Sequence, residues 1–131
     1  MRINFGGWHF SYPMELASFK GYPHPALYCL SVLDAAWEPY PYRPVYFGET
    51  ADVETRAIGP THHAIERWLS LGGRVADLHV SISYVPHLIE YSRQLAESML
   101  IAKYRTLLNQ GFSVPKNELG RVASIMTGQR N

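Results

Sequence analysis

Four side chains in this sequence are of types that together could hydrolyse a phosphodiester bond. Tyr28 and Tyr46 lie in two strand-like runs, and Arg56 follows Tyr46 by ten residues. A nearby guanidinium can favour the phenolate form of a tyrosine, which then acts as a base, and it can also bind a phosphate. Glu97 lies on a long helical stretch, and one carboxylate suits a Mg²⁺ ion that takes its other ligands from water and phosphate. The four residues therefore predict metal-dependent attack of water on a phosphodiester.

The elements around these residues are expected to bring them together. If the runs that hold Tyr28 and Tyr46 pair as adjacent antiparallel strands, the two rings can lie on one face of the sheet. Arg56, on the following helix, returns to the same end of the sheet. Asn109 lies twelve residues after Glu97, about 3.3 turns of one helix, so both side chains would point roughly the same way. We expect Asn109 to order phosphate or backbone near the site.

Apolar patterns and turn residues divide the chain into strands and helices. The prolines between 38 and 44 exclude a central strand there and predict a hairpin loop. Alternating apolar and polar residues predict a strand with one buried face, and apolar residues at helical spacing predict helices. The predicted elements are strands over Leu27–Leu33, Val45–Gly48 and Leu78–Tyr84, a short helix that contains Arg56 and ends at Gly59-Pro60, a helix from Pro60 to Leu71, and a helix over Ile89–Leu108. These elements predict an α+β fold, a small antiparallel three-stranded sheet flanked by helices.

The chain from Ala26 to Asn109 resembles the GIY-YIG nuclease module. It holds in order the tripeptide Ala26-Leu27-Tyr28, the run Tyr46-Phe47-Gly48-Glu49-Thr50-Ala51-Asp52-Val53-Glu54-Thr55-Arg56, then Glu97 and Asn109. Ala26-Leu27 stands in place of Gly-Ile, and Phe47 stands in place of the central Ile of the second motif. Both changes exchange apolar residues whose task is strand packing, so neither removes chemistry.

The resemblance implies a role for each residue that matches a motif position. Its catalytic set comprises Tyr28, Tyr46, Arg56 and Glu97. It implies that Tyr28 is the general base and that Glu97 holds a single divalent cation, Mg²⁺ or Mn²⁺. A histidine often follows the arginine within about one helical turn in this family, whereas here Gly59-Pro60 intervenes, so either histidine of the next pair can fill that role. The residues expected to contact substrate are Gly48, His62, His63 and Asn109.

Two other interpretations use the same residues differently. His62 and Glu66 are separated by one helical turn, so together with His63 they could ligate a transition metal. A polar first turn of a helix explains these residues more simply. The second alternative is a catalytically silent module on the same fold that binds nucleic acid or a protein.

Composition limits the class of protein. The chain has 131 residues with 47% apolar and 18% charged residues, which predicts one domain: a wrapping segment over 1–25, a core module over 26–109 and a tail over 110–131. No signal-like or membrane-spanning apolar run and a single cysteine, Cys29, predict a cytoplasmic protein without a membrane partner. A net charge of +1 disfavours tight stand-alone binding to DNA. The expected function is a metal-dependent endonuclease acting on DNA in preference to RNA, with a protein partner or a homodimer as a source of further affinity.

Overall fold

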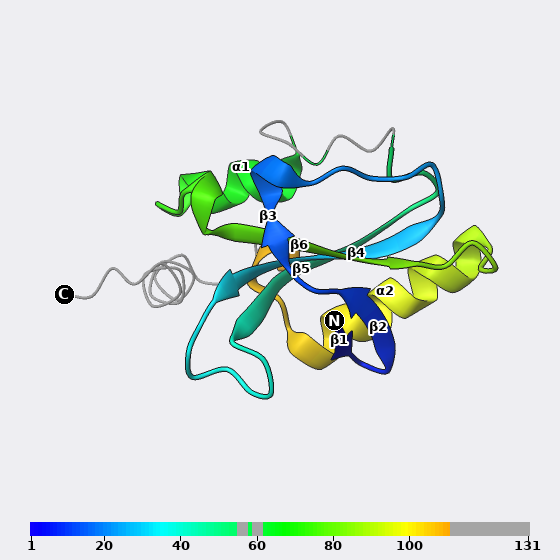
Figure 1. Cartoon of the computed structure of the whole chain (residues 1–131), viewed down its shortest axis with the longest axis horizontal. Helices are drawn as coiled ribbons and strands as arrows, with labels where there is room; N and C mark the ends of the chain where they lie inside the picture. Colours follow the sequence, from blue (N-terminus) through cyan, green and yellow to red (C-terminus); the bar gives the residue numbers. More distant parts are fainter. Residues whose placement is uncertain (55–57, 59–61, 111–131) are drawn as a thin grey trace.

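A central antiparallel sheet organises the chain (Figure 1). The computed structural model describes residues 1–54, 58 and 62–110. These residues form a four-stranded sheet in the order β3-β6-β4-β5 and a two-stranded sheet, β1-β2. The elements are β1 (Arg2–Phe5), β2 (Trp8–Ser11), β3 (Met14–Glu15), the 3₁₀ turn η1 (Leu16–Ser18), β4 (Ala26–Leu33), β5 (Tyr42–Thr50), α1 (His63–Ser70), the 3₁₀ turn η2 (Val75–Asp77), β6 (Leu78–Tyr84), α2 (Glu90–Tyr104) and the 3₁₀ turn η3 (Leu107–Asn109). The α+β class is confirmed.

The predicted three-stranded sheet needs a correction, because the sheet has a fourth strand. β3 pairs with β6 through Met14 opposite Val80 and Glu15 opposite His79. The three predicted strands are present as β4, β5 and β6, and β5 begins at Tyr42 rather than Val45. This earlier start includes Pro44, which is tolerated because β5 is an edge strand.

The wrapping segment predicted over 1–25 contains the β1-β2 hairpin. Gly6 and Gly7 join its strands with φ of 60° and 91°. Two residues at positive φ give a turn whose twist matches that of paired strands, and glycine adopts this conformation without a steric penalty. The hairpin buries Ile3, Phe5 and Phe10 against the central sheet.

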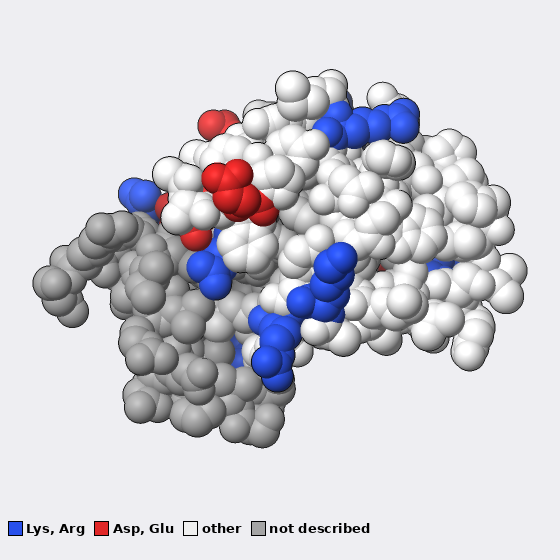
Figure 2. Space-filling view, turned by 90° about the horizontal axis from the view of Figure 1, so that it is seen from below, with Lys and Arg blue, Asp and Glu red and all other residues white. Residues whose placement is uncertain are grey.

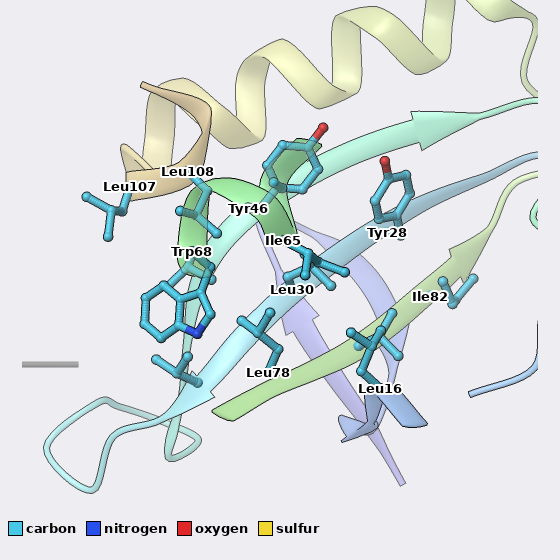
Figure 3. Packing of buried hydrophobic residues seen from close by; sticks show 14 of the residues in the cluster. Leu16, Tyr28, Leu30, Tyr46, Ile65, Trp68, Leu78, Ile82, Leu107 and Leu108 are labelled. Atoms are coloured by element: carbon cyan, nitrogen blue, oxygen red, sulfur yellow. The ribbon is translucent and has the colours of Figure 1, made fainter. Parts of the chain in front are cut away.

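The two faces of the central sheet carry separate hydrophobic clusters. The first cluster joins Tyr28 and Leu30 of β4 to Ile65 and Trp68 of α1 (Figure 3). The second cluster lies on the opposite face; it includes Leu27, Cys29 and Phe47 with residues of the hairpin and of α2. Figure 1 shows α1 on one side of the sheet and α2 with the hairpin on the other. β4 is therefore covered on both faces, and seven of its eight residues are buried.

The last predicted helix, Ile89–Leu108, is shorter in the structure. α2 ends at Tyr104, and Arg105 follows in the left-handed conformation with φ of 49°. The chain then forms η3, whose Leu107 and Leu108 are buried in the first cluster, although α2 packs in the second. The apolar pattern continues through the break because both segments bury leucines, but they bury them on different faces of the sheet. Of the helices in the described ranges, none has the length and apolar character needed to cross a membrane.

Candidate functional site

Tyr28 and Tyr46 lie side by side on the face of the sheet that α1 covers. In the β4-β5 pairing Tyr28 is opposite Gly48 and Leu30 is opposite Tyr46, so the two tyrosines are diagonal neighbours. Their ring centroids are 5.9 Å apart. Figure 3 shows both hydroxyls pointing away from the leucine side chains of the first cluster. The structure thus brings these two predicted site residues together.

Gly48 provides the space that the Tyr28 ring occupies. A Cβ atom at position 48 would lie 2.3 Å from Tyr28 Cζ and 2.5 Å from its hydroxyl oxygen. Any larger residue would therefore displace a fully buried ring. Contact of Gly48 with substrate stays a prediction, and its observed contact is with Tyr28.

His62 is hydrogen-bonded to Tyr28, and a second hydrogen bond holds its ring in one tautomer. The Tyr28 hydroxyl lies 2.9 Å from His62 Nε2, and the Ala64 backbone N–H donates to His62 Nδ1 at 3.1 Å. His62 is the N-cap of α1, a position that favours a side chain able to accept such a bond. Because Nδ1 accepts this hydrogen bond, neutral His62 carries its proton on Nε2. His62 therefore donates to the Tyr28 oxygen.

His63 forms a second imidazole–phenol pair beside the first. Its Nε2 atom lies 3.0 Å from the Tyr46 hydroxyl. The two histidine rings are stacked, with centroids 4.6 Å apart and planes inclined by 20°. The four rings of Tyr28, Tyr46, His62 and His63 thus form one cluster at the start of α1.

The pairs of this cluster differ in their access to solvent. Tyr28 is fully buried, and Tyr46 and His62 are 6% and 5% exposed. His63 is exposed. Protons exchanged between the cluster and bulk water can therefore pass through the His63 ring.

Arg56, predicted to bind phosphate, lies outside the described residues, as do the predicted helix end at Gly59-Pro60 and most of the tail over 110–131.

Glu97 belongs to a helix on the side of the sheet opposite the tyrosine rings. Its helix, α2, packs through Ala96 and Leu100 in the second cluster. One turn before Glu97, Arg93 donates from Nε to Glu49 of β5 at 2.9 Å and ties the helix to that strand. Because β5 is the edge strand, the Glu97 carboxylate would have to approach the phenols around this edge.

Asn109 binds the backbone of β5, and its predicted position on the helix of Glu97 is wrong. It lies on η3, after the break at Arg105. The Phe47 N–H donates to Asn109 Oδ1 at 2.9 Å, and Asn109 Nδ2 donates to the Phe47 carbonyl at 3.0 Å. The Thr106 hydroxyl also bonds to Asn109 Oδ1. Asn109 was expected to order phosphate or backbone, and its observed partner is the backbone of Phe47. Its side-chain amide bonds to the outer edge of β5 in the way that the backbone of a further strand would.

Metal-binding groups are sparse in the described ranges. Residues 1–54, 58 and 62–110 contain no cluster of three or more His, Cys, Asp or Glu side chains placed to hold an ion. At the alternative site of His62, His63 and Glu66, both ring nitrogens of His62 are already bonded. Glu97 alone is compatible with Mg²⁺, which keeps several waters and accepts phosphate oxygens as ligands. It would be the protein ligand in such a site.

Sequence reasoning left open which histidine joins the site, and the structure pairs both with tyrosines. The available signal was that His62-His63 stands at a helix start, where the first residue caps and the second begins the helix. The Glu49–Arg93 ion pair had no sequence signal, because 44 residues separate its partners.

Comparisons of the chain with protein-family models, curated proteins and solved structures found no match. Function is therefore inferred from the residues and geometry described above.

Proposed function

We propose that this protein is a metal-dependent endonuclease that hydrolyses phosphodiester bonds of DNA, in preference to RNA, by attack of water. The observation that supports this proposal is the pairing of each tyrosine of the motif with an imidazole, Tyr28 with His62 and Tyr46 with His63. Phenols bonded in this way can exchange protons with a reacting group, which general acid–base catalysis requires. The order of the motif residues in the sequence adds to this support.

Tyr28 acts as the general base in this proposal. The His62 Nε2–H donates a hydrogen bond to the phenol oxygen, and such a bond favours the deprotonated phenol. Tyr28 first loses its own proton to solvent, and the phenolate then accepts a proton from the attacking water. Arg56 binds the scissile phosphate, and Glu97 holds a Mg²⁺ or Mn²⁺ ion. When bound, that ion supplies stabilisation of negative charge on the phosphoryl oxygens.

The charges of the molecule favour weak binding to nucleic acid unless a partner contributes. On the face that Figure 2 shows, the Lys and Arg side chains of the described residues form a few small groups among uncharged residues. Together with a net charge of +1, this distribution supports modest, salt-dependent affinity. We place the protein in the cytoplasm, where the free thiol of Cys29 would stay reduced, and we propose a protein partner or a homodimer as the source of additional affinity.

Cleavage of supercoiled plasmid DNA with Mg²⁺ or Mn²⁺ tests the proposal. Glu97→Ala and Arg56→Ala should each lower the cleavage rate by about 10²-fold or more, because each removes a group that stabilises charge in the transition state. Glu90→Ala, at an exposed position in the first turn of α2, and Arg74→Ala, whose side chain is 77% exposed, are the matched controls. If the Glu97 and Arg56 variants cut as fast as the wild-type protein, the assignment is wrong.

A catalytically silent nucleic-acid-binding or protein-interaction module is the second candidate. The full burial of Tyr28 favours it, because water must reach this hydroxyl before Tyr28 can act as a base. Salt-dependent binding to DNA with no cleavage in any divalent cation would support this alternative.

A further inference from the structure

Tyr46 and His63 form the pair to which the proposed function gives no separate task. Hydrolysis of a phosphodiester requires two proton transfers: the attacking water loses a proton, and the departing oxygen gains one. Tyr28 serves the first transfer in the proposed function. The second transfer needs a donor that can be recharged from solvent.

The two imidazoles differ in their ability to act as such a donor. His62 is buried, and its Nδ1 lone pair is committed to the Ala64 N–H, so its only proton in the neutral form is the one directed at Tyr28. His63 is exposed, and its Nε2 atom faces the Tyr46 hydroxyl at 3.0 Å. His63 can therefore take up a proton from water and hand it to Tyr46.

The placement of the phenols suits two opposite tasks on one phosphate. In an in-line displacement the attacking and departing oxygens lie on opposite sides of phosphorus. Tyr28 and Tyr46 are diagonal neighbours with ring centroids 5.9 Å apart, and Figure 3 shows both hydroxyls pointing away from the leucine side chains of the first cluster, so both can face one group. Each hydroxyl has its own imidazole.

We propose that Tyr46 and His63 form a proton relay that protonates the departing oxygen. This inference rests on the proposed nuclease function. As water oxygen bonds to phosphorus and gives its proton to Tyr28, the bond from phosphorus to the departing oxygen breaks. That oxygen takes the Tyr46 proton, and Tyr46 takes the Nε2 proton of His63. His63 enters the step as the imidazolium, having taken a proton from water, and ends it as neutral imidazole with its proton on Nδ1. Tyr46 is a catalytic residue in this step, and His63 is a positioning residue that acts through it.

A change of one atom in the substrate tests the relay. The position at which the wild-type protein cuts duplex DNA is mapped first. A second duplex then carries sulfur in place of the departing oxygen at that position, and the cleavage rates of the two duplexes are compared in Mn²⁺. A thiolate departs without protonation because thiols are far more acidic than alcohols. His63→Gln should slow cleavage of ordinary DNA by about 10²-fold, the lower range for general acid catalysis, and leave cleavage of the sulfur substrate nearly unchanged.

Three further single variants and one double variant complete the test. Tyr46→Phe should show the same dependence on the departing atom, and adding His63→Gln to it should cause little further loss, since both act in one step. His62→Gln should slow cleavage of both substrates equally, because it serves the attacking water. Glu90→Gln, at an exposed position in the first turn of α2, is the control and should cut both substrates at the wild-type rate.

Two results would overturn the relay while leaving nuclease function intact: an equal loss on both substrates in His63→Gln, or no loss on ordinary DNA. Absence of any cleavage by the wild-type protein is a different result, and it would overturn the proposed function and the relay together.

Discussion

At the scale of single residues, the geometry of the candidate site depends on His62, which caps α1, and on Gly48, whose lack of a side chain leaves room for the Tyr28 ring. His62 uses one ring nitrogen to cap α1 and the other to bond Tyr28. Serine, threonine, aspartate and asparagine are the usual caps, so a histidine at this position combines the start of a helix with a ring that reaches the sheet. Strand pairing was enough to predict that Tyr28 and Tyr46 are neighbours. Their imidazole partners could not be predicted in the same way, because they depend on where α1 begins.

Gly48→Ala should destabilise the protein because the added Cβ would lie 2.3 Å from Tyr28 Cζ. We expect a loss of about 1–3 kcal/mol in the free energy of unfolding, the range for overpacking a buried site, measured by urea denaturation. In a Tyr28→Leu background, which removes the distal ring atoms, the same substitution should cost much less. An equal cost in both backgrounds would show that Tyr28 is not the obstacle.

At the scale of elements, the sequence predicts the strands better than the end of the last helix. The alternation of apolar and polar residues over 78–84 indicates a strand with one buried face. The short apolar run of β4, which begins after a proline, indicates a buried strand. The break after Tyr104 had no sequence signal, since neither glycine nor proline lies there and Leu107 and Leu108 continue the apolar spacing. A left-handed arginine ends α2, and the leucines then pack on the other face of the sheet.

Asn109→Ala should open the outer edge of β5. The variant loses both hydrogen bonds from residue 109 to the Phe47 backbone, so the Phe47 N–H and carbonyl lose these partners. We expect a loss of about 1–3 kcal/mol in the free energy of unfolding and faster hydrogen exchange at the Phe47 amide. Gln110→Ala is the control, because its backbone carbonyl, which binds Arg67, is retained. Unchanged exchange at Phe47 in the Asn109 variant would contradict this role.

At the scale of the whole molecule, burial on both faces of one sheet couples the candidate site to global stability. β4 holds Tyr28 in the first cluster and Cys29 in the second, so opening either face exposes the same strand. The α+β class was predictable because the strand and helix patterns are distinct in the sequence and a hairpin loop joins two of the predicted strands, as in an antiparallel sheet. The assignment of α1 and α2 to opposite faces was not, because periodicity identifies a buried side without identifying the surface that covers it.

Cys29 should report on unfolding of the entire domain. Complete burial raises the pKa of its thiol well above the ordinary value of 9.0, so the reactive thiolate is disfavoured in the folded protein. The stability linked to this thiol is complete below pH 9.0 and declines as pH rises above that value. At pH 8 we expect reaction with a disulfide reagent to be limited by unfolding, and fast in urea. Fast reaction of the native protein would show that β4 is accessible.

The division of the interior by β4 gives two compartments that can be engineered separately. Residues of the β1-β2 hairpin and α2 pack on one side, and the imidazole–phenol pairs lie on the other. Effects of substitutions on well-separated groups are usually additive. Thermal tolerance can therefore be tuned by repacking around Ile3, Phe5 and Leu100, while the proton-exchanging rings keep their geometry.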